Sequence, residues 1–121
     1  MHLHTQFCIN LKTVSEANCS EHWSKKHKRH RLQKLAIKSA LQNLQYMPKF
    51  PVHVKFIRQS PRLLDKHDNL PMSFKFLYDA FCDYCIPGLR AGRADDTDQI
   101  SVEYDQIKSK NYAITVEIYH N

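Results

Sequence analysis

The sequence has very little glycine. Its two glycines, Gly88 and Gly92, both fall within 86–93. This is therefore the one stretch where the backbone turns sharply at no cost, and it predicts a mobile loop. Long apolar runs are also missing, since none approaches the roughly 18 consecutive apolar residues of a membrane span. Residues 1–5 lack the charged and then apolar pattern of a signal peptide, so we expect a cytoplasmic protein.

Cysteine is scarce, with four residues in the chain: Cys8, Cys19, Cys82 and Cys85. A chain of 121 residues that is 42% hydrophobic is long enough to fold as one domain over 1–121 without disulfides, so we expect reduced thiols. Cys82 and Cys85 have the spacing of a metal or redox pair, and Cys19 with His22 would complete a zinc site. Small buried thiols in helices explain the same pattern.

Acidic residues are almost absent from the first half of the chain. Residues 1–62 hold twelve Lys and Arg against Glu16 and Glu21, a net charge of +10. Residues 63–121 hold six Lys and Arg against ten acids, a net charge of −4, and eight of those acids are Asp. A basic surface attracts polyanions, and short aspartates suit a hard divalent cation, so the two halves together favour nuclease chemistry.

Hydrophobic periodicity predicts six elements in the order β-α-β-α-β-β. Alternating residues indicate strands at 7–12, 52–58, 101–108 and 112–120, with a tight turn at 109–111. In the second strand, Val52, Val54 and Phe56 alternate with the polar set His53, Lys55 and Arg58. We expect an α/β or α+β sandwich, in which two helices cover a small four-stranded mixed sheet.

The first helix is predicted from 16 or 20 to 46, a stretch free of glycine and proline, as one long helix or two in line. It ends at 47–51, where two prolines occur. Its apolar residues recur at mostly helical spacing: Trp23, Leu32, Leu35, Ile37, Leu41 and Leu44.

The second helix is expected to start just after Asp68 or Asn69, either of which suits a cap, and to run to about Cys85. Pro71 is tolerated in its first turn. Helical spacing places four residues on one polar face: Asp68, Met72, Lys75 and Asp79. The opposite, core-facing stripe consists of Leu70, Phe74, Leu77 and Phe81.

Two acidic clusters flank this second helix, and their members are Asp65, Asp68, Asp95, Asp96 and Asp98. Phosphodiester hydrolysis uses carboxylates to hold one or two Mg²⁺ ions, for which Mn²⁺ is a possible substitute. A nearby lysine such as Lys75 adds charge stabilisation. Helix caps, surface ion pairs and solvated turns explain each element separately, whereas their combination with a basic first half favours a metal-dependent site.

A run of cations predicts phosphate contacts along the first helix. Residues 25–31 contain five permanent cations in seven residues. The residues expected to bind DNA are Lys25, Lys26, Lys28, Arg29, Arg31, Arg62 and Arg93. His22 and Trp23 are expected to pack or cap, with DNA stacking by these residues the less favoured role.

Several motifs, in this order and spacing, resemble the RusA-like family of Holliday junction resolvases, in particular its phage and prophage subgroup. The motifs are 12–18 with 21–23, the Leu-Asp…Asp-Asn-Leu pattern at 64–70, Lys75 with Asp79, 87–96, 102–106 and 108–110. The resemblance covers nearly the whole chain. It implies a homodimer of small α/β subunits that binds Mg²⁺ and nicks opposing strands of four-way junctions.

The resemblance also implies roles for single residues. Asp68 matches the second Asp of the family motif, Asp96 the downstream catalytic Asp, and Lys75 the helix lysine. His67 occupies the place of the first Asp, and Asp65 lies three residues before Asp68, so either one completes the metal site. Asp95 and Asp98 compete with Asp96 in the same way.

The sequence thus favours a Mg²⁺-dependent endodeoxyribonuclease that resolves branched DNA by paired nicking in a dimer. Asp65, Asp68, Asp96 and Asp98 are its expected metal ligands, and Lys75 is expected to stabilise charge. One alternative is a catalytically weak DNA-binding module of the same fold. The other is a zinc-structured interaction protein.

Overall fold

The computed structural model describes residues 1–16, 22–44, 49–86 and 99–120. The elements are β1 (His2–Ile9), α1 (Trp23–Gln42), β2 (Val52–Ser60), α2 (Asn69–Cys85), β3 (Ile100–Lys108) and β4 (Ala113–His120). This order is the predicted one. Within the described ranges, neither helix is both long enough and apolar enough to cross a membrane. The glycine loop predicted at 86–93 lies, except for Ile86, outside the described residues.

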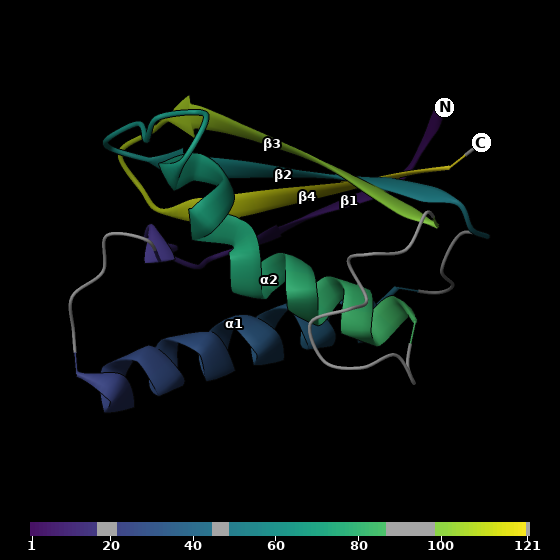
Figure 1. The fold of residues 1–121 in the computed structure, drawn as a ribbon. Coiled ribbons are helices and arrows are strands. Elements are labelled where there is room, and N and C mark those ends of the chain that lie inside the picture. Colours follow the sequence, from purple (N-terminus) through teal and green to yellow (C-terminus); the bar gives the residue numbers. More distant parts are fainter. Residues whose placement is uncertain (17–21, 45–48, 87–98, 121) are drawn as a thin grey trace.

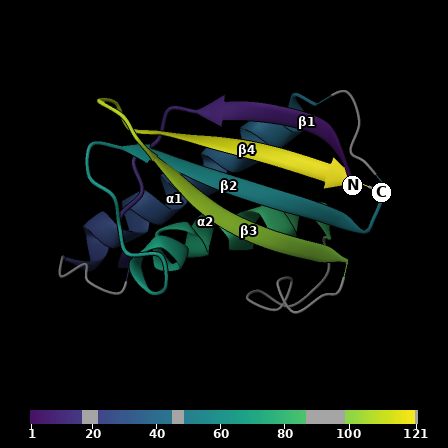
Figure 2. The ribbon, with the colours of Figure 1, turned by 90° about the horizontal axis from the view of Figure 1, so that it is seen from above.

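The four strands form one open mixed sheet in the order β1-β4-β2-β3 (Figure 2). β1 and β2 both pair with β4 in antiparallel fashion, whereas β2 and β3 are parallel. A parallel pair needs a crossover connection, and α2 supplies it. Both helices lie on the same face of the sheet, with α2 nearer to it, and no described helix or strand covers the other face, which we call the open face (Figure 1). The α+β architecture is as predicted.

Alternation along β2 produces the core. Val52, Val54 and Phe56 are buried under the helices, while His53 and Lys55 point to the open face. Arg58 was grouped with the polar residues in the sequence analysis, and that assignment was wrong, since Arg58 is 5% exposed. It follows Val52, Val54 and Phe56 at the same two-residue spacing and therefore faces inward.

Helix α2 matches its prediction closely. It begins at Asn69 and ends at Cys85, and its core stripe of Leu70, Phe74, Leu77 and Phe81 is at most 1% exposed. Lys75, opposite this stripe, is exposed. The apolar spacing was correct because this helix packs a continuous stripe against the sheet.

Helix α1 is shorter than predicted and oriented differently. It begins at Trp23, because the ring nitrogen of His22 accepts the backbone N–H of Ser24, and it ends at Gln42. Ile37 and Leu41 are buried as expected. Three other apolar residues are exposed instead of packed: Trp23, Leu32 and Leu35 are 68%, 50% and 53% exposed.

Strand β1 also differs from its prediction. It spans His2–Ile9 instead of 7–12, because its pairing with β4 continues to His2 opposite His120. A register shift between Leu3 and Thr5 breaks the strict alternation there. Because of this irregularity, the first half of the strand lacks the strict alternation of apolar and polar residues that predicts a strand.

Candidate functional site

The acidic turn, residues 65–69, precedes α2 at one end of the molecule. The Asp65 carboxylate accepts the backbone N–H groups of Asp68 at 2.9 Å and of Asn69 at 3.3 Å, and also the Asn69 side-chain amide. The Asp68 side chain caps nothing. Asp68 therefore occupies the N-cap position, as expected, but its side chain makes no capping hydrogen bond, and the carboxylate of Asp65 accepts the N–H groups at the helix start instead.

Because of these hydrogen bonds, Asp65 and Asp68 differ in how many carboxylate acceptor sites remain for a cation. The hydrogen bond from the Asp68 amide, followed by those from Asn69, holds the pKa of Asp65 below its usual 3.8 despite some desolvation. Three acceptor sites of the Asp65 carboxylate are occupied, which leaves about one of roughly four for a cation. Asp68 is exposed and keeps its carboxylate oxygens for other partners. Of the two carboxylates, Asp68 is the better placed to bind a metal ion.

The acidic turn is tied to the loop that follows β1. The hydroxyl of Ser15 donates to the Asn69 side-chain oxygen at 2.5 Å, joining residues 54 positions apart in sequence. The Gln106 side chain on β3 holds the chain just before the turn, accepting the Leu64 N–H at 2.9 Å and donating to the Leu64 carbonyl at 2.6 Å. The loop after β1 and strand β3 therefore both hold the backbone around Asp65.

The buried side chain of Arg58 forms hydrogen bonds with residues of the loops after β1 and β2. Its guanidinium donates to the Thr13 hydroxyl and carbonyl at 3.2 and 2.9 Å, to the Ser60 hydroxyl at 2.5 Å and to the Arg62 carbonyl at 3.2 Å. Burial lowers the pKa of Arg58, and nearby Tyr112 partly opposes that shift. None of the salt bridges among the described residues involves Arg58. Arg58 thus joins the loops after β1 and β2, and no described residue supplies it with a counter-ion.

A buried ion pair connects the loop after β1 to α1. The Glu16 carboxylate, 5% exposed, receives Arg29 Nη2 at 2.5 Å and Nε at 3.1 Å, and His30 Nε2 lies 3.2 Å away. The His30 ring stacks on Phe76 of α2 at 3.5 Å between centroids. The sequence did not predict that Ser15, Glu16 and His30 take part in the contacts around the acidic turn and α1. The available signal was that Glu16 is one of two acids in the first 62 residues.

Lys75 and Asp79 continue the polar face of α2 beyond the acidic turn. Lys75 is exposed, and its Nζ lies 5.7 Å from the centre of the Phe76 ring. Seven residues separate Lys75 from Asp68, which is close to two helical turns. Lys75 is thus placed on the face that starts at Asp68, as the spacing predicted.

The predicted basic run does not form one surface. Lys25, Lys28 and Arg29 line a cavity of about 350 Å³ with Lys12 and three apolar residues, and we call this cavity the cationic groove. Its lining residues are Leu11, Lys12, Val14, Lys25, Lys28, Arg29 and Leu32. Lys26 is half-buried, and Arg31 is exposed outside the groove. Helical geometry distributes a continuous run around the axis, so only part of it faces any one ligand.

A second cationic cavity lies at the same end of the sheet. Its volume is about 330 Å³, and Pro61, Lys108, Ser109 and Lys110 line it. Exposed Arg62 follows Pro61 directly. Cations from the loop after β1, the loop after β2 and the β3–β4 turn therefore gather at the end that carries the acidic turn (Figure 1).

The downstream acidic cluster is outside the described residues. Asp95, Asp96, Asp98 and Arg93 all fall in the undescribed range 87–98. The next described residue, Gln99, accepts the Val52 N–H with its carbonyl at the start of β2, the opposite end of the sheet from the acidic turn (Figure 1). The described residues thus do not bring the two acidic clusters together.

Cys82 and Cys85 lie at the end of α2, in and against the core. Cys82 is fully buried in the core, and burial raises the pKa of the Cys85 thiol to about 12, with Cys82 adding to the effect. Cys19 lies outside the described residues, and among those described no three His, Cys, Asp or Glu side chains are arranged to hold a metal ion.

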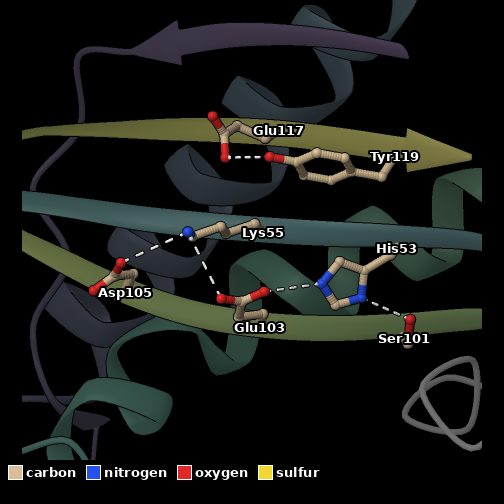
Figure 3. A network of polar contacts seen from close by, with 7 residues as sticks. All are labelled: His53, Lys55, Ser101, Glu103, Asp105, Glu117 and Tyr119. Carbon is tan, nitrogen blue, oxygen red and sulfur yellow. Dashed lines mark hydrogen bonds and ion pairs between the residues drawn. The ribbon is translucent and has the colours of Figure 1, made fainter. Parts of the chain in front are cut away.

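The open face of the sheet carries a separate polar network, drawn in Figure 3, of His53, Lys55, Ser101, Glu103, Asp105, Glu117 and Tyr119. Lys55 Nζ lies 3.7 Å from both Glu103 and Asp105. Burial lowers the pKa of Lys55. The negative charges of Glu103, Asp105 and Glu117 together raise this pKa by more than burial lowers it, so the net shift is upward. The Tyr119 hydroxyl donates a hydrogen bond to Glu117 at 2.9 Å, and this bond raises the pKa of Tyr119. Three carboxylates against one lysine make this face acidic.

Within this network, His53 contacts Ser101 at 2.7 Å through Nδ1 and Glu103 at 3.1 Å through Nε2. Serine, imidazole and carboxylate in sequence also occur in nucleophilic triads. Here the three residues occupy neighbouring positions on the parallel pair β2 and β3, and Ser101 and Glu103 are exposed. Such cross-strand pairs stabilise a solvated sheet face, and we assign the network that role.

Comparison with protein-family models and with curated proteins found no match for this chain. The similarity to the RusA-like family rests on the sequence motifs alone.

Proposed function

We propose that this protein is a Mg²⁺-dependent endodeoxyribonuclease that cuts branched DNA, including four-way junctions, as a homodimer. One observation carries the proposal: the loop 11–16, which supplies Leu11, Lys12 and Val14 to the cationic groove, is hydrogen-bonded through Ser15 to Asn69, the neighbour of exposed Asp68. Cations draw in the phosphate backbone, and a carboxylate beside them holds the metal ion that hydrolysis needs.

Asp68 is the proposed primary metal ligand. Asp65 positions the acidic turn and offers at most one remaining acceptor site. Lys75 lies on the same helix face and stabilises negative charge that develops on the phosphate. The family resemblance also implies Asp96 and Asp98 as ligands, but the described residues do not place them beside Asp68, because Gln99, which directly follows Asp98, lies at the opposite end of the sheet. When bound, Mg²⁺ or Mn²⁺ supplies an activated water and neutralises the leaving oxygen.

The first prediction concerns Asp68→Asn, which removes a charge without enlarging the side chain. Nicking of a four-way junction in Mg²⁺ should fall at least about 100-fold. Loss of a residue that only supports a metal ligand costs up to about 100-fold, so a larger fall indicates that Asp68 is itself a ligand. Binding to the same junction in EDTA should be unchanged. Asp83→Asn, on the same helix but lining a cavity between α1 and α2, is the matched control and should cut normally.

Asp96→Asn tests the downstream cluster in the same assay and should also lose cutting. Normal cutting by Asp68→Asn would overturn the assignment of the site. Wild-type protein that binds junctions and cuts none of them in Mg²⁺ or Mn²⁺ would identify the DNA-binding module instead. Sedimentation tests the dimer, because the mass of a single 14.3 kDa chain would contradict it.

A further inference from the structure

The cationic groove combines two chemistries that a purely phosphate-binding surface does not need. Four of its lining residues are cations, and three are apolar: Leu11, Val14 and Leu32. Leu32 is 50% exposed, although a leucine on a helix is stabilised by burial. A ligand that covered this side chain would gain apolar contact in addition to charge.

Charge in the groove is available to an anion. Among the described residues, none of the salt bridges involves Lys12, Lys25 or Lys28. The Lys12 Nζ lies 4.8 Å from the centre of the Tyr112 ring, which places it at the rim towards the β3–β4 turn. Arg29 differs, because Glu16 fixes its guanidinium through two nitrogens. A guanidinium plane held in this way suits stacking against a nucleobase.

We infer that the cationic groove binds an unpaired nucleotide of a single-stranded DNA arm. This inference rests on the proposed function and names the part of a branched substrate that the groove takes. A duplex presents phosphates outward but keeps its base faces stacked, so it cannot use the apolar lining. An unpaired base exposes its face, and a cavity of about 350 Å³ admits a nucleotide but no duplex. Its phosphates then meet the three lysines.

Two matched pairs on α1 test the inference. Leu32 and Leu35 are 50% and 53% exposed, yet only Leu32 lines the groove. Lys28 lines the groove, whereas Lys34 lines the cavity between α1 and α2. Affinity is measured by fluorescence anisotropy in EDTA for a thymidine oligonucleotide of about 12 nucleotides and for a duplex of equal length. Without metal no strand is cut, so binding is read independently of nuclease activity.

Leu32→Ser should weaken binding to the single strand about 3–10-fold and leave duplex binding unchanged, because one base contact is lost. Leu35→Ser should change neither. Lys28→Gln should weaken binding to both DNAs and reduce the slope of log affinity against log salt by about 0.7 for the single strand, and Lys34→Gln should not.

Equal effects of Leu32→Ser and Leu35→Ser, or equal losses of single-strand and duplex affinity in Leu32→Ser, would overturn the inference. Selective loss for the single strand in a protein that never cuts DNA would leave the groove assignment standing and refute the nuclease. Melting curves of each variant establish that its fold is intact.

Discussion

Asp65 and Asp68 are neighbouring carboxylates with different hydrogen bonds. Asp65 accepts two backbone N–H groups at the start of α2, whereas the side chain of Asp68 caps nothing. A cap satisfies amides that have no partner within the helix, and a charged acceptor does so best when it is ionised. Stability at the start of α2 should therefore depend on Asp65 and on its ionisation.

Asp65→Ala should lower the melting temperature at pH 7, while Asp68→Ala, the matched control, should leave it nearly unchanged. The pKa of Asp65 is depressed in the folded protein, so its contribution is complete above the unfolded value near 3.8 and disappears as the pH falls through the lower folded value. The difference between wild type and Asp65→Ala should thus narrow below about pH 4. A difference that stays constant down to pH 2 would contradict the ionic cap.

Helix α1 shows where a single sequence misleads about an element. Leu32 and Leu35 are spaced i, i+3 on one helical face, but Gln33, Ile37 and Leu41 face inward. Gln33 is 1% exposed, and no residue that the structure describes forms a hydrogen bond with its amide nitrogen or amide oxygen. The apolar pattern identified Ile37 and Leu41 correctly, but it grouped exposed Leu32 and Leu35 with them and missed buried Gln33, because it ranks residues by polarity and not by position around the helix.

Gln33→Leu should stabilise the fold by about 1–2 kcal/mol, because it removes two buried polar atoms that lack partners and keeps a similar volume. Urea unfolding measures the change. Gln42→Leu, at an exposed position of the same helix, is the control for helix propensity and should have little effect. A destabilised Gln33→Leu variant would indicate that the amide bonds to an ordered water or another partner in solution.

The strands and α2 were predictable, because alternation and a continuous apolar stripe are local signals. The contacts that shape the acidic turn were not. Ser15 reaches Asn69 across 54 residues, and Gln106 reaches Leu64 across 42. Arg58 looks like a surface cation in the sequence and becomes a buried clamp only through its place in β2. Such long-range pairings carry no periodicity, so one sequence cannot reveal them.

The whole molecule separates its charges in space. The open sheet face bears Glu103, Asp105 and Glu117 around Lys55. The cationic groove lies on the helix side, along α1 (Figures 1 and 2). Phosphate is attracted to one face and repelled by the other, so the molecule is oriented before contact is made.

Because of this separation, Lys28 and Lys55 should affect DNA binding differently, although each contributes one positive charge. At about 0.15 M salt the screening length is about 8 Å, so a lysine affects DNA binding only where it lies close to a phosphate. Lys28→Gln should therefore weaken duplex binding, while Lys55→Gln should not, although both lower the net charge by one. At about 0.01 M salt, where screening extends to about 30 Å, the two variants should converge. A loss confined to Lys55→Gln would place DNA on the open sheet face and contradict the groove as the binding surface.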